Sequence, residues 1–407
     1  MCIRDSIIIS IIGIIVFLAL AYLFSSDRKK IRWQYVGLLL LIQLVFAFIL
    51  LKTKFGITVV GGISDGFNYL LTKAGEGVNF VFGGFKIDPS NPPFFLNVLL
   101  PIVFISALIG ILQYTRILPL IINVLGFLIS KINGMGRLES YNAVAAAILG
   151  QSEVFISLKN ELKYISKQRL YTLTASAMST VSASIIGAYF SLVEPRYVVT
   201  AVVLNLFGGF IIASIINPYK VDEEDDKLIV EDSEVKKQSF FEMLGEYILD
   251  GFKVAIIVGA MLIGYIAIIA LLNGIVSAIF TFLSGGSINW DFQTLIGFVF
   301  APFAFLIGIP WEDAVQAGSV MATKLLSNEF VAMESLTKVK DIGEHAKGVV
   351  SVFLVSFANF SSIGIISGAI KSLNDEKGDM VARFGLKLLF GATLVSFISA
   401  AIAGIFI

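Results

Sequence analysis

The chain is poor in cysteine, in histidine and in charge. Cys2 is its only cysteine, which excludes an intrachain disulfide and any multi-thiolate metal site. His345 is its only histidine, which excludes HExxH chemistry, most zinc sites and most catalytic triads. Charged residues make up 15% of the 407 residues and the net charge is zero. This balance argues against nucleic acid, or any strongly charged macromolecule, as a partner.

What the chain has in abundance is hydrophobic sequence. Hydrophobic residues make up 57% of it, and the mean hydropathy is +0.88. Several windows of about 20 residues contain almost no charge, as is required to cross a hydrocarbon core of about 30 Å. We therefore predict an all-α polytopic membrane protein.

Eight transmembrane helices are predicted from these windows. They cover residues 7–24, 36–51, 94–112, 171–192, 197–216, 254–272, 349–370 and 386–407. Weaker or amphipathic stretches at 55–85, 116–132 and 240–249 are predicted to lie at the membrane interface. The first two spans are joined by a loop containing Arg28, Lys29 and Lys30, which the positive-inside rule places in the cytoplasm.

Two apolar segments are each interrupted by a polar knot with one carboxylate. The first is Gly150-Gln151-Ser152-Glu153, and the second is Ser327-Asn328-Glu329. A carboxylate at membrane depth is costly and usually functional, and the alternative for a single one is a structural role, bonding the free N–H groups of a helix end. Each half-segment is too short to cross, which favours two opposed re-entrant helical hairpins. Interrupted segments at corresponding places in two halves indicate an inverted-repeat transporter with a midplane site.

These patterns predict four regions along the chain. Residues 1–137 are mainly scaffold, with spans 1–3 and interfacial helices. Residues 138–216 form the first part of a transport domain, with hairpin 1 and spans 4–5. Residues 217–291 hold a cytoplasmic loop, an interfacial helix and scaffold span 6. Residues 292–407 form the second part of the transport domain, with hairpin 2 and spans 7–8.

The polar residues of the knots favour a neutral, hydroxylated substrate. Glu153 and Glu329 each lie close to an amide, and Asn359 with two serines interrupts the seventh span. Carboxylates accept hydrogen bonds from hydroxyl pairs, and amides both donate to and accept from a heterocycle edge. Lys324 is the only cation near the knots, too little for a phosphate clamp. We expect it to pair with an acid or to snorkel towards the interface.

Two classes of function fit these residues. One is transport of a small solute, and the alternative is an intramembrane enzyme that uses Glu153 and Glu329 as an acid–base pair. The fate of the substrate distinguishes them, because a transporter accumulates its substrate unchanged.

Three long segments resemble the signature segments of the concentrative nucleoside transporters. They are GQSEVFISLK at 150–159, KLLSNEFVAM at 324–333 and SFANFSSIGIISG at 356–368. The chain is especially similar to the shorter bacterial nucleoside permeases. The resemblance implies cation-coupled uptake of purine or pyrimidine nucleosides by a homotrimer in the bacterial inner membrane, working by an elevator motion. It implies no organic cofactor.

The resemblance also implies roles for individual residues. From the first hairpin, the residues that would contact the nucleobase are Gly150, Gln151, Ser152 and Glu153. Those that would bind the ribose hydroxyls are Glu329, Asn359 and Ser362, with Phe357 beside the site.

A sodium site of the family would fall on the Thr180 side chain and on the carbonyls of Ala146, Leu149 and Val181. Several bacterial permeases with a stretch like MSTVSAS (178–184) are proton-coupled, however, so the coupling ion is H⁺ or Na⁺. We favour H⁺, because a buried carboxylic acid such as Glu153 is able to carry a proton.

Overall fold

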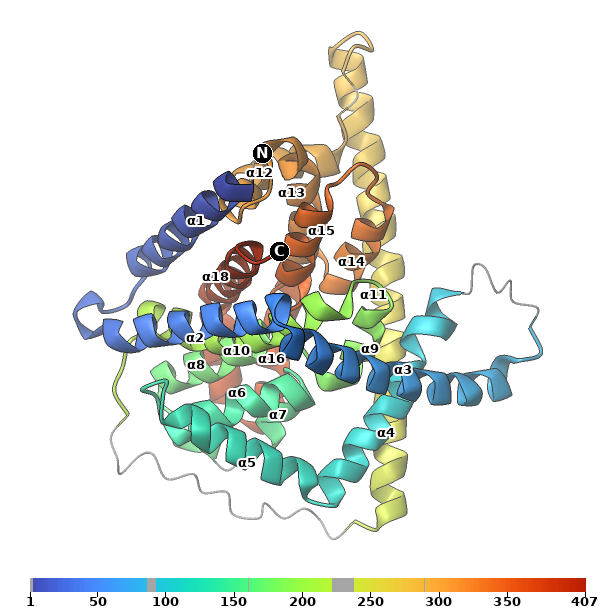
Figure 1. Ribbon diagram of the computed structural model, residues 1–407. Coiled ribbons are helices and arrows are strands. Elements are labelled where there is room, and N and C mark those ends of the chain that lie inside the picture. Colours follow the sequence, from blue (N-terminus) through green and yellow to red (C-terminus); the bar gives the residue numbers. More distant parts are fainter. Residues whose placement is uncertain (1–2, 86–92, 160, 222–237, 289) are drawn as a thin grey trace.

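The computed structural model describes residues 3–85, 93–159, 161–221, 238–288 and 290–407. All of the regular structure in these residues is helical (Figure 1), which confirms the predicted all-α class. Most of the predicted cytoplasmic loop, residues 222–237, lies outside the described residues.

The first half of the chain forms scaffold helices and then the first interrupted hairpin. Its elements are α1 (Ile3–Leu23), η1 (Arg28–Lys30), α2 (Trp33–Lys52), α3 (Lys54–Phe82), η2 (Phe95–Leu99), α4 (Pro101–Tyr114), α5 (Ile117–Ser130), α6 (Arg137–Leu149), α7 (Glu153–Ile156), η3 (Glu161–Lys163), α8 (Lys167–Ser179), α9 (Ala183–Phe190) and α10 (Pro195–Ile216).

The second half contains one very long helix and several short ones. Its elements are α11 (Phe240–Leu283), α12 (Phe292–Leu306), α13 (Trp311–Leu326), α14 (Glu329–Lys338), α15 (Glu344–Leu354), α16 (Phe360–Leu373), α17 (Asp375–Arg383) and α18 (Gly385–Gly404).

Seven helical segments of the described residues are long and apolar enough to cross a bilayer. They are α1, α2, η2 with α4, α8 with α9, α10, α11 and α18. The predicted seventh span consists instead of the short helices α15 and α16, with residues 355–359 between them. The interruption lies at Asn359 and its neighbours, where the sequence predicts it. Helices α12 and α13 form a further pair, bent by 116°.

Helix α11 differs from its prediction, because residues 240–249 and 254–272 belong to one helix of 44 residues. Figure 1 shows it running along one side of the molecule and extending past the other helices. Gly251 does not end the helix but allows close packing on α4. A Cβ atom at Gly251 would lie 2.8 Å from Ser106 Cβ and 2.9 Å from Val103 Cα.

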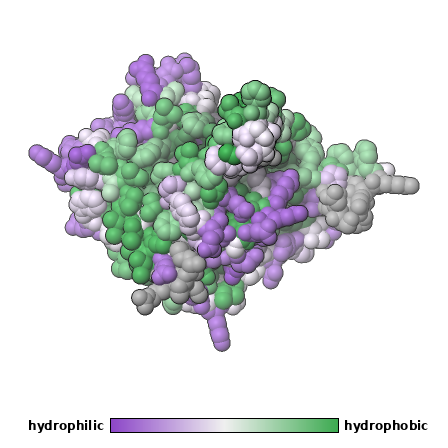
Figure 2. Space-filling view, turned by 90° about the horizontal axis from the view of Figure 1, so that it is seen from above, coloured by the Kyte–Doolittle hydropathy of each residue, from purple (hydrophilic) through white to green (hydrophobic). Residues whose placement is uncertain are grey.

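Burial separates a central set of helices from a peripheral one. In α8 with α9, in α10 and in α18, 78% of the most apolar window is buried, against 11% in α11. Gly208 lets α10 and α18 approach closely, since a Cβ there would lie 2.9 Å from Val395 Cγ1. Figure 2 shows wide areas of hydrophobic surface on one face of the molecule, as a surface in contact with lipid requires.

Candidate functional site

The first polar knot is the turn between α6 and α7. Gly150 ends α6 with φ at 119°, a conformation that L side chains rarely adopt. A Cβ there would lie 2.7 Å from Glu153 Oε2, so glycine is also required sterically. Glu153 begins α7 and accepts a hydrogen bond of 3.0 Å from Ser152 Oγ. Gln151 is buried, whereas the Glu153 side chain is exposed rather than buried as predicted.

The second polar knot is the turn between α13 and α14. Asn328 caps α14 by accepting a hydrogen bond from the backbone N–H of Val331. Glu329 follows, is 4% exposed, and is bonded through both carboxylate oxygens. Tyr189 donates to Oε1 at 2.9 Å, and Asn359 Nδ2 donates to Oε2 at 3.3 Å. Sequence reasoning missed Tyr189, because nothing distinguishes it among 12 tyrosines.

The break between α15 and α16 contributes the third group of predicted residues. Asn359 Oδ1 caps α16 by accepting from Ser362 N at 2.9 Å and from Ser361 Oγ at 2.7 Å. The same side chain therefore begins a helix with its oxygen and contacts Glu329 with its nitrogen. Ser362 and Phe357 are 1% and 8% exposed. The structure thus brings Glu329, Asn359 and Ser362 together, as expected.

A further break, at residues 180–182 between α8 and α9, was not predicted. Ser182 Oγ donates to Leu149 O, at the end of α6, across 3.1 Å. The carbonyl of Thr180 accepts a hydrogen bond of 3.1 Å from Phe357 N. The 180–182 break therefore connects the first knot to the interrupted seventh span. Its hydroxyl-rich sequence is equally typical of helix packing, so no break could be predicted there.

Two buried polar atoms of the predicted site have no hydrogen-bond partner among the described residues. They are Gln151 Oε1 and Ser362 Oγ, and others of this kind occur elsewhere in the molecule. A buried polar atom without a partner costs about 1–3 kcal/mol. Gln151 and Ser362 therefore retain hydrogen-bonding capacity for a polar ligand.

The residues predicted for sodium offer four oxygens, the Thr180 hydroxyl and the carbonyls of Ala146, Leu149 and Val181. The Ala146 carbonyl accepts from Gly150 N at 3.0 Å, within the helix, and the Leu149 carbonyl accepts from Ser182. Thr180 Oγ1 lies 3.4 Å from Ala177 O and is the only side-chain oxygen in the set. The side chain of Ala146 contains no oxygen. Each of these carbonyls keeps a second lone pair, but four oxygens are fewer than the roughly six ligands that hard cations take.

Lys324 does not pair with an acid, nor does it snorkel, so that prediction is wrong. It is 1% exposed, and its ammonium donates to Phe353 O, Ser356 Oγ and Ser396 Oγ. All three acceptors are neutral. The last turn of α15 supplies the first, the break between α15 and α16 the second and α18 the third, so the buried ammonium is fully hydrogen-bonded.

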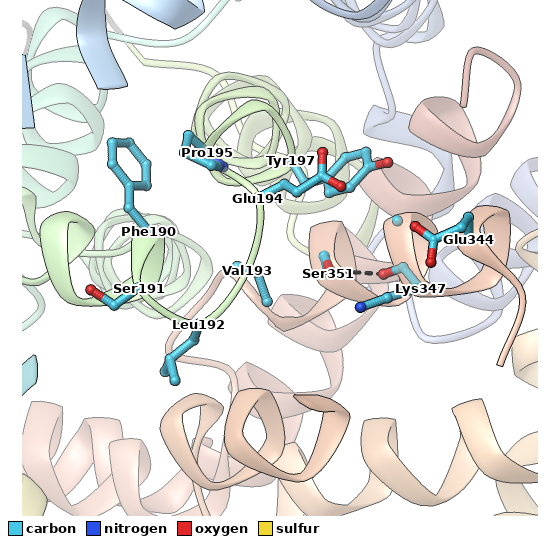
Figure 3. A pocket seen from close by; sticks show the side chains of 11 residues that line it. Phe190, Ser191, Leu192, Val193, Glu194, Pro195, Tyr197, Glu344, Lys347 and Ser351 are labelled. Carbon is cyan, nitrogen blue, oxygen red and sulfur yellow. Dashed lines mark hydrogen bonds between the residues drawn. The ribbon is translucent and has the colours of Figure 1, made fainter. Parts of the chain in front are cut away.

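A cavity of about 310 Å³ lies elsewhere in the molecule, between the α9–α10 connection and the first turns of α15. Figure 3 shows Glu194 and Tyr197 on one side of it and Glu344 and Lys347 on the other. None of the predicted site residues lines this cavity. The candidate site is therefore defined by the polar contacts at the helix breaks and not by this cavity.

Three models of known protein families together match most of the chain. A family model described as Na⁺ dependent nucleoside transporter C-terminus matches residues 197–404, just over half of the chain. The N-terminal model of the same family matches residues 12–85, and a nucleoside recognition model matches residues 95–196.

Individual relatives match over almost the full length. The chain is 38% identical to the purine nucleoside transport protein NupG of Bacillus subtilis, over 98% of this chain and 99% of the relative. It is 30% identical to the nucleoside permease NupC of Helicobacter pylori, over 98% and 97%. Such relatives, with the long apolar helices, make the chain a multi-pass plasma membrane transporter. The alternative of an intramembrane enzyme is thereby rejected.

Solved structures agree. The structure of CNTnw in an inward-facing substrate-bound state is 28% identical and superposes with a TM-score of 0.91, over 98% of each chain. An outward-facing state of a CNTnw variant gives a TM-score of 0.92, over 99% of this chain and 98% of that one. The chain belongs to the concentrative nucleoside transporter family.

Proposed function

We propose that this chain is a cation-coupled symporter for purine and pyrimidine nucleosides, and that the four helix breaks form its substrate site. The observation that carries the proposal is the setting of Glu329. Its carboxylate is buried, and Tyr189 and Asn359 fix one oxygen each. An ionised carboxylate has about four acceptor positions, so two remain for the vicinal hydroxyls of a ribose.

The proposed roles follow from the hydrogen-bonding atoms of each side chain that are available to a ligand. Asn359, Ser362 and Glu329 bind the ribose, with Phe357 beside it. The Ser362 hydroxyl supports this role because it is buried and unpaired. The nucleobase lies against the first knot, residues 150–153, where the unpaired Gln151 Oε1 accepts from a base N–H. The likeness to a purine nucleoside transport protein supports purines among the substrates.

For the translocation step we propose an elevator motion. The moving part would comprise residues 138–216 and 292–407, against a scaffold of residues 1–137 and 217–291. Hydrogen bonds inside the proposed moving part connect its two segments, as between Tyr189 and Glu329 or between Asn205 and Val355. Inward-facing, intermediate and outward-facing structures of CNTnw are consistent with two such units. A homotrimer, with the exposed apolar helices facing lipid or other copies, completes the proposal.

Protons are the coupling ion that we favour over sodium. The support is chemical: the residues predicted for sodium offer four oxygens, fewer than the roughly six ligands that a hard cation takes. The family description names sodium, so the two ions require a direct test. We assign the proton to Glu153, because Glu329 is already held by two donors, whereas the exposed Glu153 carboxylate can be reached by a proton from solution.

The ribose assignment is tested by Glu329→Gln. We measure binding to the purified variant of a riboside and of its 2′- and 3′-deoxy analogues. A hydrogen bond to a charged group contributes about 1.5–3 kcal/mol, so riboside affinity should fall by about tenfold or more. An analogue that lacks the matching hydroxyl should lose much less. Equal losses for the riboside and both analogues would contradict the assignment.

A further inference from the structure

Each N–H group of the Lys324 ammonium has a hydrogen-bond acceptor, and none of the three acceptors is an acid. Nζ lies 2.6 Å from Phe353 O, 2.6 Å from Ser356 Oγ and 3.1 Å from Ser396 Oγ. Ser356 Oγ and Ser396 Oγ are themselves 2.8 Å apart. An ammonium has three N–H donors, so each has a partner. The Phe353 ring lies 4.5 Å from Nζ, within cation–π range.

This environment resembles a monovalent cation site whose ion is tethered to the chain. Its ligands are a carbonyl, two hydroxyls and an aromatic face, all in the interior. Phe353 lies in the last turn of α15, where the helix dipole places partial negative charge. A positive charge at this position therefore stabilises the end of α15.

The same hairpin tip presents an opposite charge to the other side of the same break. Glu329 contacts Asn359, the N-cap of α16, where the helix dipole is partly positive. Five positions separate Lys324 and Glu329 along the chain. The tip of hairpin 2 thus attaches to the end of α15 through Lys324 and to the start of α16 through Glu329.

We propose that Lys324 is a positioning residue, an internal cation that holds hairpin 2 against the broken span so that Glu329 and Asn359 face the ribose. Lys324 touches the end of α15 and not the substrate. Removing its charge takes a donor from the Phe353 carbonyl and leaves the two serine hydroxyls only each other as donors, and it frees one of the two attachments of the tip. The inference rests on the proposed ribose role of Glu329, through which Lys324 acts.

The first test compares Lys324→Met with Lys377→Met. Lys377 is a matched control, because its ammonium donates to a backbone carbonyl, Ile165 O, at 2.7 Å and it contacts none of the site residues. Purified Lys324→Met should bind a riboside about tenfold more weakly and the deoxy analogues with little change. Lys377→Met should bind both as the unsubstituted protein does. Unchanged riboside affinity in Lys324→Met, or an equal loss for all ligands, would overturn the proposal.

Chemical rescue gives a readout that a purely structural role would not produce. Lys324→Ala lacks three methylenes and the ammonium, so propylammonium supplies the missing atoms. Millimolar propylammonium should restore riboside binding, and tetramethylammonium, which has no N–H donor, should not. Rescue by neither ion or by both ions would contradict a site for a hydrogen-bonding cation.

A milder variant keeps the proposal testable if substitutions of Lys324 do not fold. Ser396→Ala removes one of the three acceptors and should give a smaller loss, again selective for ribosides. A non-selective effect, or no effect, would count against the proposed role of Lys324.

The Glu329→Gln result separates the two proposals. If Glu329→Gln is not selective for ribosides, the ribose assignment fails. If Glu329→Gln is selective and Lys324→Met and Ser396→Ala are not, only the role of Lys324 fails.

Discussion

The Tyr189 hydroxyl donates a hydrogen bond of 2.9 Å to Glu329 Oε1 and so joins α9 to α14 at a buried position. The two residues are 140 positions apart. The Tyr189 ring also packs on Phe330, with 5.0 Å between ring centroids. Aromatic packing and a charge-assisted hydrogen bond together fix the carboxylate that we assign to the ribose.

Tyr189→Phe removes the hydroxyl and keeps the ring packing. Because Glu329 then loses one of two fixed donors, riboside affinity should fall by about tenfold, with a smaller effect on analogues that lack the ribose hydroxyls. Tyr171→Phe is the matched control, since that buried hydroxyl donates to Lys387 O, far from the site. Titration of purified variants by calorimetry measures both. Equal affinities in Tyr189→Phe and the unsubstituted protein would contradict the role of this bond.

Gln151→Ala should change base preference and leave ribose discrimination intact. Its amide has a donor nitrogen and an acceptor oxygen on separate atoms, so it can pair with two neighbouring positions of a base edge. Competition by purine and pyrimidine nucleosides against one labelled substrate measures the change. Gln43→Ala is a suitable control, because Gln43 is also buried but donates to Leu204 O in α10. An unaltered competition profile in Gln151→Ala would refute its assignment to the base.

The sequence predicts the structure best where polar residues and a carboxylate lie inside an apolar segment, because such groups are costly to place in a bilayer. The knots at Gly150 and at Ser327 were predictable, because polar residues and a carboxylate interrupt apolar runs and have few places to lie in a bilayer. The break at residues 180–182 was not, because serine and threonine also occur inside membrane helices, where they bond to their own helix. The sequence alone therefore revealed three of the four breaks, at the two knots and at Asn359, but not the fourth.

Contacts between residues that are far apart in the sequence could not be predicted from it. The pairing of Tyr189 with Glu329, and of Lys324 with α15 and α18, depends on tertiary packing that no local pattern records. Lys324 was expected to pair with an acid or to snorkel, yet its acceptors are one carbonyl at the end of a broken helix and two hydroxyls. Residues 240–249 and 254–272 were predicted as separate helices, because the sequence does not show that they continue into one another as α11.

Arg169 should be important for stability, because it forms a bidentate ion pair with Glu139, which is 0% exposed. Its Nε and Nη2 lie 2.6 and 2.9 Å from the carboxylate oxygens, and Tyr219 donates to the same carboxylate. Arg169→Ala leaves a buried charge uncompensated, which costs about 3–5 kcal/mol. Thermal unfolding in detergent should show a markedly lower midpoint.

Arg196→Ala provides the comparison for that measurement. Arg196 pairs with Glu194 at 2.7 Å, but the two side chains are 51% and 52% exposed. An exposed pair contributes about 0–1 kcal/mol, so the unfolding midpoint of Arg196→Ala should stay close to that of the unsubstituted protein. Similar midpoints for the two arginine variants would contradict the structural role of the Glu139 pair.

Uptake into proteoliposomes, driven separately by a pH gradient and by a Na⁺ gradient, tests the central claim most directly. We predict that an inward proton gradient drives labelled nucleoside to accumulate unchanged above its external concentration. A Na⁺ gradient at equal pH should not, and Glu153→Gln should abolish the accumulation. Accumulation under the Na⁺ gradient alone would contradict proton coupling, and equilibration without accumulation under both gradients would contradict symport itself.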